Sequence, residues 1–386
     1  MADVRGAGPG ASGWMGKMHT MACQTFPHVM GTAGGIAKAV ALIADNPKAA
    51  ADPAIRASGA RRLTSWRDAV QDPEGDLTDI CLPDSLHHKV AKAALLAGRN
   101  VCCEMPVAGM AAQARNLAGI AAAKGLVTQV GHAVPRNPVD DPARDIIANG
   151  GMDEITLFMP CQHGDTDGDP LARCLWRAGG KPAPSGIAGD AGTPVFGFLN
   201  LPVGRVSETN ADTCIVTPRR PVMSGLSCEK QAALTGTETR PEVTNPDGAS
   251  ILCGFANAAR GLIDFSRIAT GRRFLRTCRV YGTRGSLSRT DDKGNRLRLC
   301  TNDANGRRGL RGSDAGRGND ITRRFRPVPG IAPGHSDGGI IGAAEVIRSI
   351  TTGQPMWPGF GSGHPICRIA DACMDPSRPG RRVSIT

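Results

Sequence analysis

Apolar runs and amphipathic stretches alternate through the first third of the chain. Residues 39–47, 77–85 and 126–132 are short apolar runs of the length of a β-strand. Residues 87–100 and 110–125 place small and aliphatic side chains at helical spacing, with a glycine near the end of each stretch. Strands that alternate with helices across short connections predict a parallel, doubly wound sheet and hence an α/β fold.

The second half of the chain has a different pattern. Short segments in which apolar and polar residues alternate occur at 249–257, 260–269, 274–283 and 285–291. Glycine, asparagine and threonine lie between them and permit turns. This pattern predicts an antiparallel meander, and a length of 386 residues favours two domains over one.

The composition is that of a globular protein. The chain is 40% hydrophobic, and no apolar run reaches the roughly 18 residues of a membrane span. The N-terminal residues lack the basic, apolar and small-residue order of a secretion signal, so a soluble, cytoplasmic protein is expected. The 13 cysteines are dispersed without a CxxC pair, which predicts buried thiols rather than a disulfide framework.

The formal net charge is +11, and much of it comes from arginines between Arg260 and Arg326. This density fits a nucleic-acid surface, or else a solvated basic face or a pocket for an anionic cofactor or substrate. One Tyr and 4 Trp offer few platforms for stacked bases, and no nucleic-acid motif accompanies the charge. Nucleic acid is therefore not expected as a partner.

A glycine-rich stretch near the N-terminus is a candidate phosphate-binding turn. Gly13 and Gly16 hold the second and third glycine positions of GxGxxG, and Ala11 holds the first. A helix that begins there would present free N–H groups to a pyrophosphate, and Asp45, at the end of the next apolar run, would bind the ribose hydroxyls of NAD. The competing interpretation is a flexible leader, because glycine is abundant here and residues 3–12 contain one apolar β-former.

A series of segments spread in order over nearly the whole chain carries a resemblance. The segments are 13–22, 41–47, 65–108, 130–138, 150–155, 169–180, 185–204, 254–267, 280–288 and 343–360. Together they resemble the Gfo/Idh/MocA family of oxidoreductases, which includes glucose–fructose oxidoreductase, inositol dehydrogenases and levoglucosan dehydrogenase.

The resemblance implies two domains and a type of ligand for each. Residues 1–133 would form a Rossmann domain for NAD or NADP. Residues 134–386 would form a C-terminal α/β domain with a large, mostly antiparallel sheet for substrate binding and oligomerisation, giving a homodimer or homotetramer. The substrate would be a sugar or polyol. Asp45 favours NAD, since the 2′-phosphate of NADP would face a carboxylate, while Lys48 nearby weakens that preference.

The resemblance also assigns cofactor-binding residues. They are Gly13, Trp14, Met15, Gly16, Asp45, Pro83, His87, Glu104, Trp176 and Arg177. Pro83 and His87 match a proline–histidine pattern beside the nicotinamide, although Asp84 replaces the usual asparagine. A histidine near a helix start can equally act as a cap, and this interpretation stays open. Trp176 and Arg177 match a pair that reaches toward cofactor or substrate.

The predicted strand at 100–103 leads into the first departure from the family. Glu104 and Pro106 match the outer residues of its Glu-Lys-Pro motif, but Met105 occupies the lysine position. A thioether cannot transfer a proton near neutral pH.

The second departure concerns the family's Asp-x-x-x-His pair. Asp190 matches the aspartate, whereas Pro194 occupies the histidine position and Gly197 that of a further aspartate. Residues 133–135 are Ala-Val-Pro, where the family has Asn-Tyr-Arg. The catalytic positions are therefore Asp190, Met105 and Pro194, of which only Asp190 can act as a base.

These residues predict an NAD(P)-dependent oxidoreductase that transfers a hydride between a secondary hydroxyl of a sugar or polyol and the nicotinamide, with impaired activity. The alternative is a non-catalytic regulatory homologue that senses a dinucleotide or a sugar. No metal site is expected, since Cys161 and His163 are two neighbouring ligand types without two more. The particular sugar and the reaction direction are not encoded in these motifs.

Overall fold

A computed structural model describes most of the chain. The described residues are 3–43, 58–131, 136–172, 176–181, 183–221, 241–291, 296–301, 309–313, 324–325, 334–375 and 381–385. The chain divides into two compact units, Met1–Asp140 with Gly316–Cys367, and Asp141–Ala315 with Arg368–Thr386. The expected boundary at 133/134 separates a cofactor-binding domain from a substrate-binding domain. This functional division stays a prediction.

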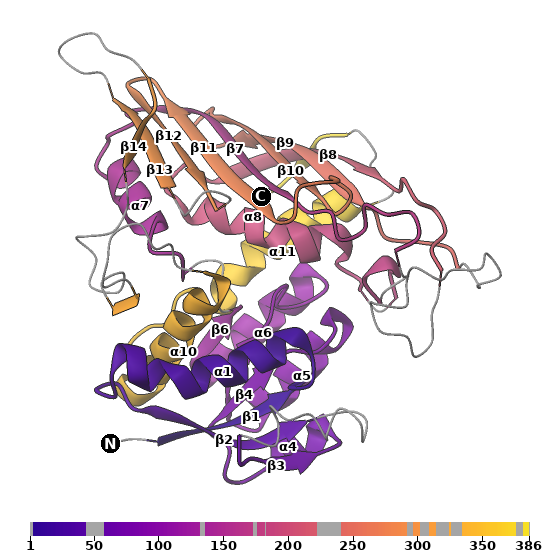
Figure 1. The fold of residues 1–386 in the computed structure, drawn as a ribbon, viewed down its shortest axis with the longest axis vertical. Helices are drawn as coiled ribbons and strands as arrows, with labels where there is room; N and C mark the ends of the chain where they lie inside the picture. The colour runs from indigo at the N-terminus through magenta and orange to yellow at the C-terminus, as the bar shows by residue number, and fades with distance from the viewer. Residues whose placement is uncertain are drawn as a thin grey trace. The chain divides into compact units, whose positions relative to one another are not determined.

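The first unit contains a six-stranded sheet in the order β3-β2-β1-β4-β5-β6 (Figure 1). Every pair in it is parallel. The strands are β1 (Asp3–Pro9), β2 (Ile36–Ile43), β3 (Arg61–Leu63), β4 (Leu77–Ile80), β5 (Asn100–Cys103) and β6 (Thr128–Val130). The predicted doubly wound Rossmann sheet is confirmed. The strand order reverses between β1 and β4, and doubly wound sheets bind ligands beyond the carboxyl ends of the strands at such a point.

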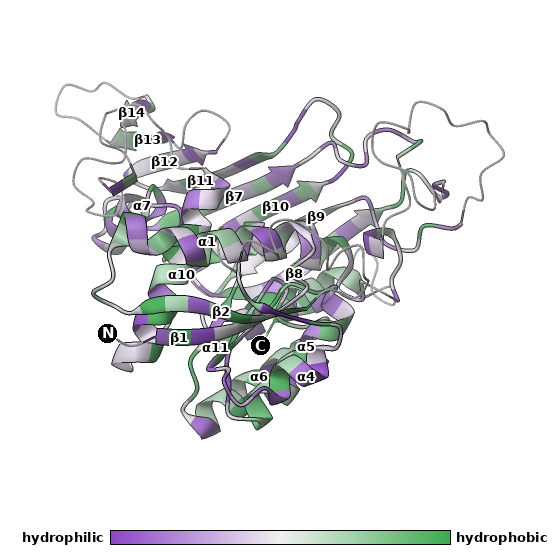
Figure 2. Ribbon diagram, turned by 60° about the horizontal axis from the view of Figure 1, so that its bottom comes forward, coloured by the Kyte–Doolittle hydropathy of each residue, from purple (hydrophilic) through white to green (hydrophobic). Residues whose placement is uncertain are grey.

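Helices cover both faces of this sheet. They are α1 (Trp14–Met30), α4 (Trp66–Gln71), α5 (Asp84–Leu96), α6 (Ala111–Lys124) and α10 (His335–Thr352). The helix α10 comes from the far end of the sequence and packs against α1. Apolar positions run along α6 and α10 (Figure 2).

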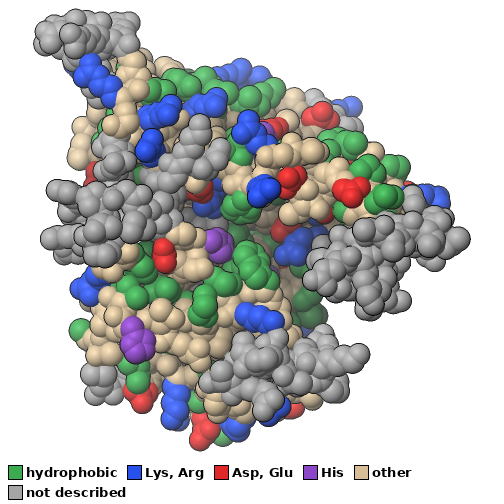
Figure 3. Space-filling view, viewed as in Figure 1, with side chains coloured by type: hydrophobic (Ala, Val, Ile, Leu, Met, Phe, Trp, Pro, Cys, Tyr) green, Lys and Arg blue, Asp and Glu red, His purple; other side chains and the backbone are tan. Residues whose placement is uncertain are grey.

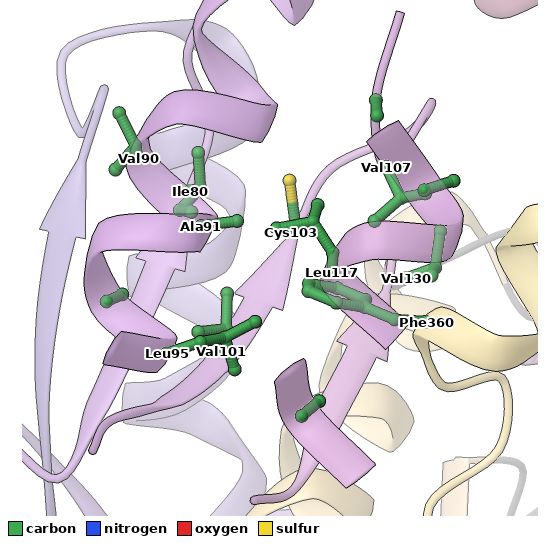
Figure 4. Close-up of a cluster of buried hydrophobic side chains, with 14 of the residues drawn as sticks. Ile80, Val90, Ala91, Leu95, Val101, Cys103, Val107, Leu117, Val130 and Phe360 are labelled. Carbon is green, nitrogen blue, oxygen red and sulfur yellow. The ribbon is translucent and has the colours of Figure 1, made fainter. Parts of the chain in front are cut away.

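Adjacent residues of β5 face different cores. Cys103 belongs to the core beneath α5 and α6, together with Val90, Leu95 and Leu117 (Figure 4). Cys102 belongs to the core that β1 and β4 share with α1 and α10. Because side chains alternate along a strand, two neighbouring thiols occupy separate environments.

The first strand forms despite its glycines. Residues 3–9 contain few β-forming side chains, yet they pair with β2 over their whole length and with β4 at Gly6 and Ala7. A central strand has hydrogen-bonding neighbours on both sides, so its backbone is satisfied even where side chains are missing. The flexible-leader interpretation is therefore wrong for residues 3–9.

The second unit contains a nine-stranded, mostly antiparallel sheet in the order β14-β13-β12-β11-β7-β10-β9-β8-β15. The strands are β7 (Ile155–His163), β8 (Val206–Cys214), β9 (Gly248–Phe255), β10 (Arg260–Ser266), β11 (Leu275–Gly282), β12 (Gly285–Thr290), β13 (Arg296–Thr301), β14 (Arg311–Ser313) and β15 (Val383–Ser384). This large sheet was predicted.

The meander is interrupted at one place. The strand β7 lies between β10 and β11, parallel to β10 and antiparallel to β11. The strands β10 and β11 follow each other in sequence but are not neighbours in the sheet, because β7 lies between them and pairs with both.

One face of this sheet is packed and the other is more open. Alternate residues of β7 and β10 are buried, and Phe158 and Phe265 make edge-to-face contacts with Phe255 and Phe196. The segments η2 (Trp176–Ala178), η3 (Ala188–Gly192), α8 (Thr193–Phe196) and η4 (Gly197–Asn200) carry the predicted site residues of this unit. The helix α7 (Asp140–Ala148) begins at the unit boundary, and α11 (Phe360–Met374) belongs to the first unit up to Cys367 and to the second unit after it. None of the described helices is long and apolar enough to cross a membrane.

Candidate functional site

The turn between β1 and α1 is shaped by glycines. Gly10 has a φ of +88°, and a Cβ on it would lie 2.4 Å from the carbonyl oxygen of Cys81. A Cβ on Gly16 would lie 2.3 Å from the carbonyl oxygen of Gly10. Only glycine fits both positions. The spacing of Gly13 and Gly16 predicts Ala11 as the first residue of the motif, whereas in the structure Gly10 supplies the left-handed conformation.

The start of α1 offers backbone donors. Gly13 precedes the helix and has no side chain with which to cap it, while Trp14, Met15 and Gly16 open its first turn. The first N–H groups of a helix have no carbonyl partner within that helix, and the helix dipole favours an anion there. The indole of Trp14 is 68% exposed and stacks on His335, with ring centroids 5.6 Å apart. Asp45, the expected ribose ligand, lies outside the described residues.

His87 ties two loops together. Its buried ring has Nδ1 2.7 Å from the carbonyl oxygen of Pro106 and Nε2 2.7 Å from that of Leu82. Pro83 directly precedes α5, and His87 lies in its first turn. Neither contact caps the helix, because a helix start offers N–H groups and both partners of His87 are carbonyl oxygens. The ring therefore holds the loop after β4 against the loop after β5.

Glu104 points inward from the end of β5. One carboxylate oxygen lies 2.9 Å from Nε2 of His19, and the other accepts a hydrogen bond from the backbone N–H of Met105 at 3.1 Å. Met105 packs against the core beneath α5 and α6. The carboxylate thus fixes the backbone at Met105, whose side chain has no acid or base function.

His19 is the centre of a polar cluster that no sequence motif predicts. Its Nδ1 lies 2.9 Å from an oxygen of Asp79 and 3.3 Å from Sγ of Cys81. Burial by itself would lower the pKa of His19, but the negative charge of Asp79 raises it well above the ordinary value. Burial raises the pKa of Cys81 to about 12. The only local signal was that His19 lies one turn after Gly16.

Three predicted residues of the second unit do come together. Nε of Arg177 on η2 donates to Asp190 on η3 at 2.9 Å, and the Arg177 guanidinium stacks over the Trp176 ring at 4.3 Å from its centroid. Both charged side chains are more than a third exposed. The Asp190 carboxylate is therefore held in an ion pair with Arg177.

Pro194 lies in the first turn of α8, directly after the π-helical segment η3. A proline has no N–H to donate to the preceding turn, and the widened turn before it accommodates that loss. Gly197 has room for a side chain, since a Cβ on it meets nothing within 4 Å. The departures at 133–135 lie outside the described residues.

Cys161 and His163 are held separately on β7. The Cys161 thiol contacts the hydroxyl of Thr277 at 3.1 Å, and Nε2 of His163 lies 2.5 Å from Asp264. Among the described residues, the group of His, Cys, Asp and Glu close enough to share an ion is instead His19, Asp79 and Cys102.

Part of the arginine-rich segment is internal. Arg267, Arg276 and Arg289 are buried, and each pairs with an aspartate, Asp167 or Asp291. These three arginines do not contribute to a basic surface. On the face shown in Figure 3, Lys and Arg side chains are scattered among acidic and apolar ones.

Comparison with known proteins agrees with this architecture. Residues 9–132 match the oxidoreductase family with an NAD-binding Rossmann fold, and residues 142–288 match the GFO/IDH/MocA C-terminal domain. The chain belongs to the GFO/IDH/MocA family.

Several relatives extend this match over the full length. A levoglucosan dehydrogenase from Pseudarthrobacter phenanthrenivorans is 28% identical over 364 residues, covering 94% of this chain and 93% of the relative. The apo structure of a levoglucosan dehydrogenase is similar with a TM-score of 0.92 and 28% identity, covering 100% of this chain and 99% of the other. A complex of that enzyme with NADH and levoglucosan has a TM-score of 0.90 at 26% identity, covering 100% of both chains.

Proposed function

We propose that this protein binds NAD(H) at the β1–α1 turn and acts as an oxidoreductase on a hydroxyl group of a sugar or polyol. The observation that carries the proposal is the turn itself, in which Gly10 and Gly16 bring the backbone close to the start of α1 at the point where the strand order reverses. Membership of the GFO/IDH/MocA family supports the same cofactor class.

The residues at the turn fit a dinucleotide. A Cβ at Gly16 would clash with the backbone of Gly10 and Ala11 in the turn. The first-turn amides of α1 have no carbonyl partner within the helix and would be available as donors for a pyrophosphate. When bound, the nicotinamide would supply the hydride acceptor for alcohol oxidation. Asp45 supports NAD over NADP, because a carboxylate at this position hydrogen-bonds the ribose hydroxyls and repels a 2′-phosphate.

The substrate class rests on relatives. Levoglucosan dehydrogenase structures similar to this chain have been solved with levoglucosan and with L-sorbose. A cyclic sugar or polyol is therefore the class of substrate that we propose. A homodimer or homotetramer and a cytoplasmic location stay predictions, and light scattering of the purified protein would decide the first of them.

We further propose that turnover is low. Alcohol oxidation releases a hydride to the cofactor and a proton to a base, and the two positions where the family resemblance implies lysine and histidine hold Met105 and Pro194. Loss of one general base typically lowers a rate by about 10²–10⁴. Asp190 is the remaining candidate base, and its ion pair with Arg177 competes for the same carboxylate.

Titration with NADH, followed by nicotinamide fluorescence, tests the cofactor site. Gly16→Ala should weaken NADH binding at least tenfold, because its Cβ would lie 2.3 Å from the Gly10 carbonyl oxygen. Gly119→Ala on α6 is the matched control, since a Cβ there meets nothing within 4 Å. Circular dichroism establishes that both variants are folded. Equal NADH affinity in the Gly16 variant and the control, or no NADH binding by the unaltered protein, would contradict the proposal.

The alternative is a regulatory protein that senses a dinucleotide or sugar without turnover. The packing of Met105 against an apolar core favours it, because this side chain contributes to stability rather than to chemistry. An enzyme and a dinucleotide sensor both require cofactor binding, so a turnover assay on repaired variants is needed to separate them.

A further inference from the structure

Metal-ligand side chains from three elements form a largely buried cluster on the face of the first sheet that is covered by α1. His19 comes from α1, Asp79 from β4 and Cys102 from β5, and one ligand atom of each lies within 4.8 Å of the others. Asp79 and Cys102 are direct partners in the parallel pairing of β4 and β5, which places both side chains on the face toward α1.

Cys81 adds a fourth ligand type to this cluster. It lies two residues after Asp79, so its side chain returns to the same face of the sheet. Its Sγ is 3.3 Å from Nδ1 of His19. The set is therefore one imidazole nitrogen, one carboxylate and two thiols, all from residues that have no place in the hydride-transfer chemistry proposed above.

The cluster borders a cavity that the sequence of β1 creates. The cavity has a volume of about 50 Å³, and its lining includes His19, Asp79, Cys81 and Cys102 as well as Gly6 of β1. A Cβ on Gly6 would meet nothing within 4 Å, so the missing side chain leaves room directly above the sheet. An ion with its ligands drawn together fits within this space, since a single water needs only about 10–15 Å³.

The donor set selects the kind of ion. Thiolate and imidazole ligands in a four-coordinate arrangement are typical of Zn²⁺, whereas Ca²⁺ and Mg²⁺ require mainly oxygen ligands in larger number. Zinc–ligand bonds of about 2.0–2.3 Å place tetrahedral ligand atoms roughly 3.3–3.8 Å apart. The ligand atoms of His19, Asp79 and Cys102 lie within 4.8 Å of one another and need shifts of no more than about 1 Å to reach that geometry. Sγ of Cys81 joins them through its position 3.3 Å from Nδ1 of His19.

Glu104 supplies the outer partner that zinc-bound histidines usually have. It lies 2.9 Å from Nε2 of His19. A hydrogen bond donated by Nε2–H to this carboxylate directs the lone pair of Nδ1 toward Asp79 and Cys81. Carboxylates in this role orient the ring and increase its basicity.

We propose that His19, Asp79, Cys81 and Cys102 form a structural zinc site that joins α1 to β4 and β5. Four protein ligands close the coordination sphere, so the site stabilises the fold and does not activate water. Because α1 begins at the dinucleotide turn, the ion also fixes the helix that carries this turn. The competing arrangement is a buried ion triad in which protonated His19 donates to both Asp79 and Glu104.

Metal analysis of untagged protein purified without chelator tests the proposal. We expect about one zinc per chain. Removal of the ion by a chelator should lower the thermal midpoint by several degrees, and returning Zn²⁺ should restore it. Replacement by Co²⁺ should give the visible absorption of a tetrahedral site together with a thiolate-to-cobalt charge-transfer band.

Adjacent cysteines provide a matched pair of variants. Cys102→Ser should abolish the charge-transfer intensity from one thiolate and lower zinc affinity at least a hundredfold, whereas Cys103→Ser, on the opposite face of β5, should retain the ion. Glu104→Gln should lower zinc affinity by about 10–100-fold. If the unaltered protein takes up no stoichiometric zinc and no cobalt spectrum forms, the ion triad is correct. Retention of the full spectrum by the Cys102 variant, or its equal loss in both cysteine variants, also overturns the assignment.

Discussion

The β1–α1 turn and the η2–η3–α8 segment differ in which part of the chain would carry their proposed roles, the backbone in the first and individual side chains in the second. The turn is formed by backbone geometry, with Gly10 and Gly16 allowing close approaches that any side chain would block. The segment in the second unit depends on individual side chains, Arg177, Asp190 and the residue at 194. Cofactor binding and chemistry are therefore separable. A chain can keep the first while single substitutions remove the second, and this is the state that we propose for this protein.

The largest effect is expected when the two side chains that the family resemblance implies are restored and the turn is left unchanged. The double variant Met105→Lys with Pro194→His should raise the rate of NADH formation with a cyclic sugar or inositol by orders of magnitude, while each single change should do little, because residues that act as a unit are not additive. Absorbance of NADH measures the rate. A proline in the interior of a helix would cost roughly 3 kcal/mol, but Pro194 lies in the first turn of α8, so the thermal midpoint should change little.

Two outcomes would contradict that expectation. A high rate in the unaltered protein would mean that Asp190 or another group already serves as the base. An inactive double variant that still binds NADH would favour the sensing function instead.

The preference for NAD over NADP tests the proposed cofactor site. Asp45→Ala should weaken NAD binding about 10–100-fold, the effect of losing hydrogen bonds to a charged group, and should weaken NADP binding much less. Competition of each nucleotide against bound NADH gives the two affinities. An equal loss for both would exclude Asp45 as the ribose ligand.

The exposed ion pair of the second unit should contribute little to stability. Arg177→Met breaks its bond to Asp190, and because both side chains are more than a third exposed, the free energy of unfolding should fall by no more than about 1 kcal/mol. Urea denaturation measures it. In the repaired double variant, the same change should alter the pH dependence of turnover if Asp190 takes part as a base. A loss of several kcal/mol would show that the pair is structural.

The smallest effect is expected at Asp264. The hydrogen bond from His163, together with a hydrogen bond from Ser250, holds the pKa of Asp264 below its usual range, although burial acts in the opposite direction. A carboxylate with a lowered folded pKa stabilises the fold above its unfolded pKa of about 3.9, and this contribution is lost as the pH falls below it. The difference in unfolding free energy between the unaltered protein and Asp264→Asn should therefore shrink between about pH 6 and pH 3. A difference independent of pH would contradict this origin.

Part of the local geometry around the candidate site was predictable. The glycine spacing predicted a tight turn before α1, and the short range from Trp176 to Asp190 contains three residues that the structure brings together. The roles of these residues stay predictions. His87 was predicted as important, but its two carbonyl partners, Pro106 and Leu82, became visible only in three dimensions. The arginine-rich segment predicted a basic face or an anion pocket, because a sequence does not reveal which aspartates neutralise the buried arginines.

The two sheet types, the glycine turn and the family could be predicted from the amino-acid sequence, because they depend on periodicity and on motifs that lie within a few residues of one another. The tertiary structure alone decided where β7 enters the second sheet, that α10 packs against α1, and that His19 meets Asp79 and Glu104. The partners of His19 lie 60 and 85 residues away. Contacts over such separations follow from the way parallel strands bring their carboxyl ends together under one helix, and no local pattern of residues records that arrangement.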